Sequence, residues 1–265
     1  MRHGGQIVVD CLKAQGVTRV FCVPGESYLP VLDGLYNSGI DVVVCRHEGG
    51  AAMMAEAHGK LTGTPGVAFV TRGPGATNAS AGVHVARQDS TPMILFIGQV
   101  SRGYRDREAF QEVDFRAMFG PLAKWVAEIE TTERIPEYIG HAFATAMNGR
   151  PGPVVLSLVE DALFAAAEVA DIGPVTRVAP RCTRADAEAI WARLRGAERP
   201  LVIVGGGAWT ATAAADVARL AERSGLPVAT AFRRQDYIDN THANYVGDFG
   251  IGPSPALRAR IDEAD

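Results

Sequence analysis

Short segments that are apolar throughout alternate with amphipathic helical segments over residues 1–165, and this alternation constrains the fold more than any other feature. The predicted strands cover residues 19–23, 41–45, 67–71, 93–97, 124–129 and 154–158. Strands without alternating polar positions are buried on both faces, as they are in parallel sheets. The sequence therefore predicts an α/β fold with a doubly wound parallel sheet that helices cover on both sides.

The end of this alternation predicts a domain boundary, so that residues 1–165 form the first domain. Residues 166–182 combine glycine and proline with no clear hydrophobic period, which is typical of a linker. A second alternation of helices and strands covers residues 183–265 and ends on a predicted helix with no further strand. We therefore expect a central α/β domain that is incomplete, in a chain truncated from a longer polypeptide.

Composition excludes several classes of function. The 26 Lys and Arg residues are scattered and are outnumbered by 30 Asp and Glu residues, which gives no electrostatic reason to bind nucleic acid. No apolar run reaches the roughly 18 residues of a membrane-spanning helix, and the first residues lack a signal-peptide core. We expect no nucleic-acid or membrane partner and a cytoplasmic location. The 4 cysteines form no Cys-x-x-Cys pair, and we expect no metal ligand in this chain.

Three loops that directly follow predicted strands carry the residue types of a ligand site. These loops cover residues 23–27, 46–52 and 70–78. They converge if the sheet is parallel, because the carboxyl ends of parallel strands meet at one edge. The second loop places Glu48 beside small residues at a predicted helix start; a carboxylate there also has a purely structural explanation, since helix N-termini favour negative charge. The glycine-rich third loop lacks the Gly-Lys-Ser/Thr ending of a P-loop, which argues against nucleotide hydrolysis.

Short motifs in and beyond these loops resemble, in order and spacing, the pyrimidine-binding domain of thiamine diphosphate enzymes of the acetolactate synthase family. The motifs are VPG at 23–25, RHE at 46–48, GPGATN at 73–78, DSTP at 89–92, GQV at 98–100, FQE at 110–112 and GRPGP at 149–153. Further along, RPLVIVGGG at 199–207 and SGLPV at 224–228 are similar to the central domain of that family.

The resemblance implies a role for individual residues. Glu48 matches the family's glutamate, which lies beside N1′ of the cofactor's pyrimidine and stabilises its imino tautomer; we expect it to be the catalytic residue. The cofactor-binding residues implied are Pro24, Gly25, Glu48, Gly75 and Asn78. Phe110 and Gln111 match the substrate side. The alternatives are a turn glycine at Gly25, a helix-start residue at Asn78, and a buried aromatic beside a solvated amide at Phe110 and Gln111.

The resemblance also implies a reaction. It is the decarboxylation and carboligation of a 2-oxo acid by an acetolactate synthase-like enzyme that uses thiamine diphosphate and Mg²⁺. In the family, the Mg²⁺ ligands lie on a C-terminal diphosphate domain that this chain does not supply. The site is completed by the diphosphate domain of another subunit, so we expect a homodimer or homotetramer, and we expect this chain alone to be inactive.

Several positions depart from the family pattern. Glu26 follows the first glycine where the family has a second glycine, Arg72 replaces a small residue, and Glu130 falls where a substrate-side lysine is usual. These departures favour an alternative, a decarboxylase or carbon–carbon lyase of the same superfamily that acts on another 2-oxo acid or an acyl-CoA. Residues 232–236 read FRRQD where flavin-containing members carry a Met-Gly-Leu-Gly run, which argues against FAD. A third alternative is a non-catalytic fragment.

Overall fold

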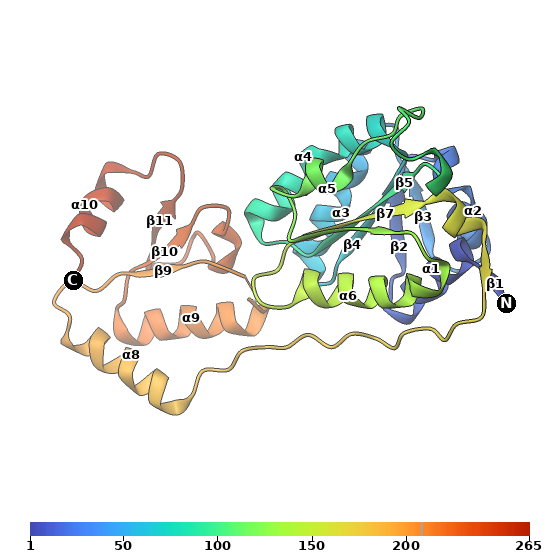
Figure 1. Cartoon of the computed structure of the whole chain (residues 1–265). Coiled ribbons are helices and arrows are strands. Elements are labelled where there is room, and N and C mark those ends of the chain that lie inside the picture. The colour runs from blue at the N-terminus through green and yellow to red at the C-terminus, as the bar shows by residue number, and fades with distance from the viewer. Residues whose placement is uncertain (208) are drawn as a thin grey trace. The chain divides into compact units, whose positions relative to one another are not determined.

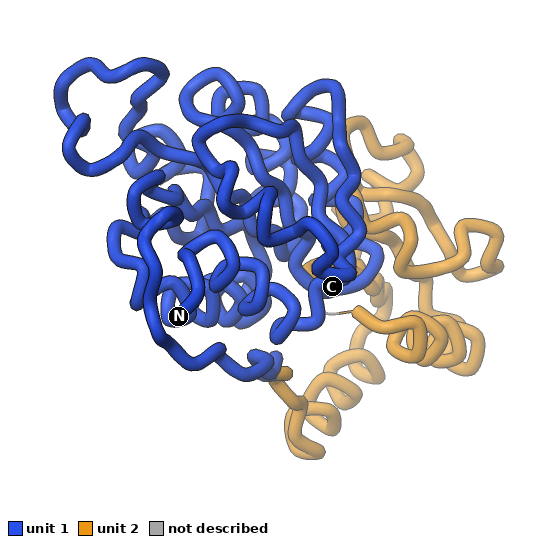
Figure 2. The backbone as a smooth tube through the Cα atoms, turned by 90° about the vertical axis from the view of Figure 1, so that its right-hand side faces the viewer, with its two compact units in different colours: residues 1–178 blue, residues 179–265 orange. Residues whose placement is uncertain are grey.

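The computed structural model describes residues 1–207 and 209–265, and the chain folds as two compact units (Figures 1 and 2). The first unit is Met1–Val178 and the second is Ala179–Asp265. Among the helices of these residues, none has the length and apolar character needed to cross a bilayer.

The first unit is built on a six-stranded sheet with the order β3-β2-β4-β5-β7-β6, in which every neighbouring pair is parallel. Its strands are β2 (Arg19–Cys22), β3 (Asp41–Val44), β4 (Gly66–Val70), β5 (Met93–Gln99), β6 (Trp125–Ile129) and β7 (Pro153–Val159). Every residue of β4, β5 and β7 is buried. The predicted α/β fold with a parallel sheet is confirmed, and its core strands are the ones without alternating polar residues.

Two layers of helices lie on opposite sides of this sheet (Figure 1). One layer contains α1 (Gly4–Ala14), α2 (Leu29–Leu35), α6 (Ile135–Met147) and the short α7 (Glu160–Phe164); the other contains α3 (Glu48–Thr62), α4 (Gly73–Asp89) and α5 (Phe115–Phe119). Single turns of 3-10 helix are η1 (Glu26–Tyr28), η2 (Arg102–Tyr104) and η3 (Thr132–Arg134). Small residues let α3 and α4 approach closely: a Cβ on Gly82 would lie 2.5 Å from Ala52 Cβ.

The segment after α7 packs on the first unit, although the sequence predicts a linker from residue 166. Strand β8 (Ala166–Ala167) pairs antiparallel with β1 (Arg2–His3). Farther along, Val169, Ile172 and Val175 pack against the apolar core. These apolar side chains recur at every third residue, which matches neither the two-residue period of a strand nor the 3.6-residue period of a helix, so the sequence pattern does not reveal that they are partly buried.

The second unit contains a three-stranded parallel sheet with the order β11-β10-β9. The elements are α8 (Arg184–Gly196), β9 (Val202–Val204), α9 (Ala211–Ser224), β10 (Val228–Ala231), η4 (Gln235–Tyr237), β11 (Tyr245–Phe249) and α10 (Pro255–Glu263). Strand β11 is absent from the sequence prediction. It contains Gly247 at a φ of 121°, and it is only partly buried, so it lacks the apolar run that identifies the other strands.

Candidate functional site

The order of the strands brings three loops to one edge of the first sheet. Strands β3, β2 and β4 are neighbours and run parallel, so the turns that follow them lie side by side. These turns lead into α3, η1 and α4, respectively. The carboxyl edge of a parallel sheet is where α/β proteins usually bind ligands.

Glu48 and Asn78 meet at this edge. Asn78 Nδ2 donates a hydrogen bond to Glu48 Oε2 at 2.9 Å, across 30 positions of sequence. Glu48 is the first residue of α3, and the preceding His47 caps the helix: its Nδ1 accepts a hydrogen bond from the backbone N–H of Gly49 at 3.0 Å. The helix N-terminus and the amide N–H of Asn78 both place partial positive charge beside the carboxylate. Glu48 is half-buried and Asn78 is exposed, so both remain accessible to a ligand.

Two glycines keep space beside this carboxylate. A Cβ on Gly75 would lie 3.2 Å from Thr71 Cγ2 and 3.5 Å from Glu48 Oε1, so any larger side chain would fill the space next to the carboxylate. A Cβ on Gly25 would lie 2.6 Å from Thr71 Cβ, which is closer than side-chain atoms approach one another. The preceding residue, Pro24, is exposed. The structure therefore brings all five predicted cofactor-binding residues to the three neighbouring loops.

Ser27 and Thr71 join two of these loops, and the sequence analysis did not select either of them. The hydroxyl oxygens of Ser27 and Thr71 lie 2.9 Å apart, within hydrogen-bond distance. Ser27 is fully buried, and a Cβ on Gly98 would lie only 1.9 Å from its Oγ. The available signal was a hydroxyl residue near the end of each of two strands. Their pairing depends on the adjacency of β2 and β4, which sequence spacing does not determine.

The loop of residues 105–112 is held closed by the carboxylate of Glu112. This carboxylate accepts hydrogen bonds from the backbone N–H groups of Asp106 at 2.9 Å and Ala109 at 3.2 Å, and it pairs with Arg105 Nε at 3.0 Å. The hydrogen bond from the backbone of Asp106 is the main cause that holds the pKa of Glu112 below its ordinary value of 4.5. The carboxylate of Glu112 therefore links both parts of the loop, and Arg105 also pairs with Glu128.

This loop presents Phe110 and Gln111. Phe110 is 72% exposed, so the alternative of a buried aromatic at this position is wrong: the closed loop holds the ring outside the apolar core. Gln111 has a φ of 62°, and its carbonyl accepts a hydrogen bond from the backbone N–H of Gly73 at 3.0 Å. The loop thus rests directly on the glycine-rich turn that carries Gly75.

We predict that Glu112→Gln loosens this loop. Glutamine keeps the size of the side chain but removes the charge that strengthens its hydrogen bonds to the backbone and to Arg105. Hydrogen bonds to charged groups contribute about 1.5–3 kcal/mol, so the amides of Asp106 and Ala109 should exchange with solvent about 10- to 100-fold faster. Glu108→Gln, the same chemical change on an exposed side chain of the same loop, should leave those rates unchanged.

The same contacts predict a pH dependence with a definite sign. Because the pKa of Glu112 is lower in the folded protein, its contribution to loop stability is complete above pH 4.5 and is lost as the pH falls through the folded-state pKa. After correction for intrinsic exchange, the amides of Asp106 and Ala109 in the wild type should exchange faster at low pH than at neutral pH. The same amides in Glu112→Gln should show no such change with pH. Equal protection of the two proteins at neutral pH would contradict the role of this carboxylate.

A cavity of about 310 Å³ adjoins the Phe110 loop. Its lining residues are Arg72, Val100, Ser101, Tyr104, Ala109, Phe110 and Glu160. They come from the turns after β4, β5 and β7, which are neighbours in the sheet, and from the 105–112 loop. The turn after β4 therefore contributes to two places: Gly75 lies beside Glu48, and Arg72 lines the cavity.

Comparison with family models identifies both parts of the chain. The model described as "Thiamine pyrophosphate enzyme, N-terminal TPP binding domain" matches residues 2–118, and the model described as "Thiamine pyrophosphate enzyme, central domain" matches residues 187–265. This chain belongs to the thiamine pyrophosphate enzyme family. Thiamine pyrophosphate is another name for thiamine diphosphate, so the resemblance drawn from the motifs is confirmed.

Similar proteins include several acetolactate synthases. The chain is 35% identical over 266 residues to "Acetolactate synthase isozyme 2 large subunit" of Escherichia coli. The matched region covers 99% of this chain and 48% of that protein. It is 32% identical over 266 residues to "Acetolactate synthase" of Bacillus subtilis, with 99% and 46% covered. It is 36% identical over 272 residues to "Acetolactate synthase isozyme 3 large subunit" of Escherichia coli, and the matched region covers 100% of this chain and 47% of that protein. The chain thus spans about half the length of these curated relatives.

The residues at the Glu48 edge fit the pyrimidine part of the family's cofactor. A flat ring needs open space beside a carboxylate, and Gly75 leaves that space because even a Cβ there would be in contact with Glu48 Oε1. A ring nitrogen needs a group that shares a proton, and the accessible carboxylate of Glu48 is such a group.

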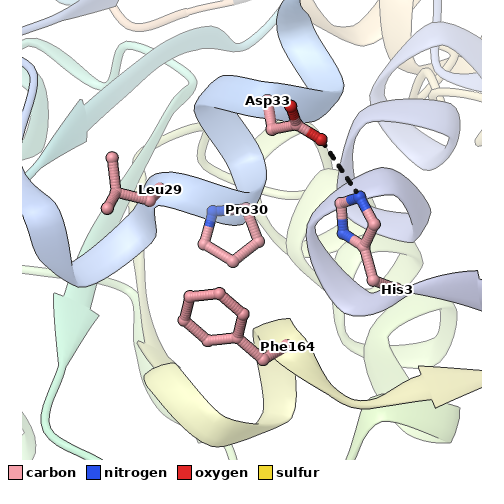
Figure 3. A pocket seen from close by; sticks show the side chains of 5 residues that line it. All are labelled: His3, Leu29, Pro30, Asp33 and Phe164. Carbon is pink, nitrogen blue, oxygen red and sulfur yellow. Dashed lines mark ion pairs between the residues drawn. The ribbon is translucent and has the colours of Figure 1, made fainter.

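Other candidate positions lie away from Glu48. Glu130, the counterpart of the family's lysine, is exposed and follows β6, which is separated from β4 by β5 and β7. A second cavity, of about 320 Å³, is lined by His3, Leu29, Pro30, Asp33 and Phe164 (Figure 3). Figure 3 shows His3 and Asp33 pointing toward each other, at 3.5 Å between Nε2 and Oδ2. This cavity includes none of the residues that the family resemblance selects.

Proposed function

We propose that the protein that carries this chain catalyses the decarboxylation and carboligation of a 2-oxo acid with thiamine diphosphate, in the manner of an acetolactate synthase. The observation that carries the proposal is the accessible Glu48 carboxylate, hydrogen-bonded to Asn78 at the carboxyl edge of the sheet and bordered by Gly75. The acetolactate synthases among its relatives support this assignment.

The residues at this edge have distinct roles in the proposed reaction. When bound, thiamine diphosphate supplies the nucleophilic carbon and the ring that takes up the electron pair released on decarboxylation. Glu48 holds a proton against the N1′ nitrogen of the pyrimidine. Asn78 donates to Glu48 Oε2 and thereby fixes the plane of the carboxylate, which leaves Oε1 for the ring. Gly25 and Gly75 admit the ring, and the 105–112 loop presents Phe110 and Gln111 toward the 2-oxo acid.

The proposal includes a cation and a second subunit. Mg²⁺ binds diphosphate through oxygen ligands, and among the residues that the structure describes no group of three or more His, Cys, Asp or Glu side chains is arranged to hold a metal ion. We propose that the Mg²⁺ ligands belong to a diphosphate domain of another subunit, in a homodimer or homotetramer. FAD is not part of the proposal. The cytoplasmic location and the domain boundaries at 165 and 182 stay predictions from sequence.

A decarboxylase or carbon–carbon lyase of the same superfamily is the second candidate. The observation that favours it is Arg72, whose side chain is 8% exposed and lines the cavity under the Phe110 loop. A charged residue at this place differs from the small residue of the acetolactate synthase pattern and points to a substrate other than pyruvate.

Product analysis separates the two candidates. The protein that carries this chain is incubated with thiamine diphosphate, Mg²⁺ and pyruvate, and the products are identified by NMR. Formation of acetolactate is the result expected for the first candidate, whereas an aldehyde formed from a different 2-oxo acid supports the second. If the cofactor binds but no 2-oxo acid or acyl-CoA is consumed, both assignments are wrong and the chain has a non-catalytic role.

A further inference from the structure

Arg72 has a buried hydrogen-bond donor that the protein leaves unused. Its Nη1 donates to Glu26 Oε1 at 3.1 Å, and its Nη2 lies 3.7 Å from Glu160 Oε2. Its Nε is buried and has no hydrogen-bond partner among the residues that the structure describes. Buried N–H groups are almost always paired, because a donor removed from water without an acceptor destabilises the folded state. An oxygen atom of a bound ligand would supply the acceptor that Arg72 Nε lacks.

The same side chain lines a cavity large enough for a ligand group. The cavity of about 310 Å³ lies at the low end of the range for small-molecule sites and has apolar walls at Val100, Ala109 and Phe110. The volume of this cavity is several times the volume that the methyl group of pyruvate occupies. The rest of the wall is polar, at Arg72, Ser101, Tyr104 and Glu160. A buried polar donor beside an apolar wall selects for a ligand with a polar atom at a defined place.

The position of this cavity connects it to the Glu48 edge. Glu48, Gly25 and Gly75 follow β3, β2 and β4, whereas the cavity is formed after β4, β5 and β7. The turn after β4 is shared, because Arg72 is the N-cap residue of α4 and Gly75 lies in the first turn of that helix. A molecule that reacts beside the Glu48 edge therefore has the cavity next to it, on the side where Phe110 stands.

The charges around Arg72 decide what kind of oxygen fits. Two carboxylates face the guanidinium: Glu26, which is 65% exposed, and Glu160, which also accepts a hydrogen bond from Ser101 Oγ at 3.4 Å. Arg72, Glu26 and Glu160 together carry one positive and two negative charges, so the group has a net negative charge. A further carboxylate from a ligand would be repelled, whereas a neutral carbonyl oxygen would pair with the free Nε–H without that cost.

We propose that Arg72 determines substrate specificity by binding a neutral oxygen acceptor on the side chain of a 2-oxo acid longer than pyruvate. The proposal rests on the second candidate function, an enzyme that acts on a 2-oxo acid other than pyruvate, and it defines the substrate class of that site. It explains why a charged residue is buried at a position where the acetolactate synthase pattern has a small one: Glu26 and Glu160 hold the guanidinium in the wall of the cavity, and its buried Nε–H has no partner among the described residues.

Three 2-oxo acids with the same arrangement of non-hydrogen atoms test the proposal in the protein that carries this chain, loaded with thiamine diphosphate and Mg²⁺. They are 2,5-dioxohexanoate, which ends in a neutral ketone; 5-methyl-2-oxohexanoate, its apolar isostere; and 2-oxoglutarate, which ends in a carboxylate. The wild type should show a kcat/KM for the ketone about 10-fold or more above both others, since a buried donor rejects a substrate that cannot pair with it.

Two variants separate the role of Arg72 from a general effect on folding. Arg72→Leu should remove the preference of the ketone over its apolar isostere. Glu26→Gln changes an exposed residue, keeps Arg72 in place and removes one negative charge, so the ratio of kcat/KM for 2-oxoglutarate to that for the ketone should rise about 10-fold. Arg116→Leu, at an exposed arginine of α5, is the matched control and should leave all ratios unchanged.

Each outcome decides the matter. Consumption of all three acids with ratios that neither Arg72→Leu nor Glu26→Gln alters would overturn the role of Arg72 and leave the proposed function standing. If Arg72→Leu does not fold, the test is the ratio of kcat/KM for 2-oxoglutarate to that for the ketone in Glu26→Gln. A rise in this ratio supports the role of Arg72, and an unchanged ratio contradicts it. If the loaded wild type consumes no 2-oxo acid at all, the proposed function fails, and the specificity role fails with it.

Discussion

Replacement of Glu48 by Gln is expected to slow the exchange of the C2 proton of bound thiamine diphosphate for deuterium by about 100- to 10,000-fold, the usual range for loss of a general acid–base group. Glutamine has the size of glutamate and keeps an oxygen that can accept the hydrogen bond of Asn78 Nδ2. Its amide NH₂ can donate a hydrogen bond to N1′ of the pyrimidine but does not transfer the proton. The change therefore removes the proton-sharing role and leaves the geometry of the edge in place.

The measurement is quenched-flow exchange followed by NMR of the released cofactor, in the protein that carries this chain. Cofactor occupancy is determined in parallel, so that weak binding is not taken for slow exchange. Glu137→Gln, an exposed glutamate of α6 that pairs with Arg134, is the control and should exchange at the wild-type rate. Exchange at the wild-type rate in fully loaded Glu48→Gln would remove Glu48 from the proposed mechanism.

Replacement of Phe69 by Ala is expected to reduce the free energy of unfolding of the first unit by about 3–5 kcal/mol, because it leaves a cavity in a close-packed core. Phe69 is fully buried in the middle of β4, between the rings of Tyr28 and Phe96, with ring centroids at 5.9 Å and 4.7 Å. Tyr28 in turn donates its hydroxyl to the carbonyl of Val23, which closes the turn that carries Gly25. The same substitution should therefore loosen one of the three loops of the site.

Hydrogen exchange of peptides from β4 and β5 in increasing urea measures this loss in the first unit alone. Phe164→Ala is the matched control, because its ring is 59% exposed and its removal should cost less than about 1 kcal/mol. A loss below about 1 kcal/mol for Phe69→Ala would mean that the neighbouring rings close the cavity. The packing of Tyr28 against β4 would then contribute little to holding the Gly25 turn.

Local sequence chemistry determines most of the architecture of the first unit. All six strands of its sheet fall within a residue or two of the predicted ranges, since a strand buried on both faces must be apolar throughout. The parallel arrangement then requires the loops around Gly25, Glu48 and Gly75 to share one edge. For this reason the candidate catalytic carboxylate was identifiable before any contact was known, and the family motifs at the same positions agree with it.

Partly buried segments were harder to predict. Strand β11 is half-buried and contains Gly247. The extended segment after residue 166 packs Val169, Ile172 and Val175 on the core at every third position, which is the period of neither a strand nor a helix. In both cases the backbone is held by neighbours that are distant in sequence. The hydrophobic period, which reports only on local burial, carries no record of such neighbours.

By itself, the sequence determined the alternation of strands and helices, the glycine-rich turns and the place of Glu48 at a strand end, because each depends on residues close together in the chain. Only the tertiary structure decided which side chains meet: Asn78 with Glu48, Ser27 with Thr71, and Arg72 with Glu26 and Glu160. These pairs depend on the order β3-β2-β4-β5-β7, which the packing of the whole sheet selects and no local spacing encodes.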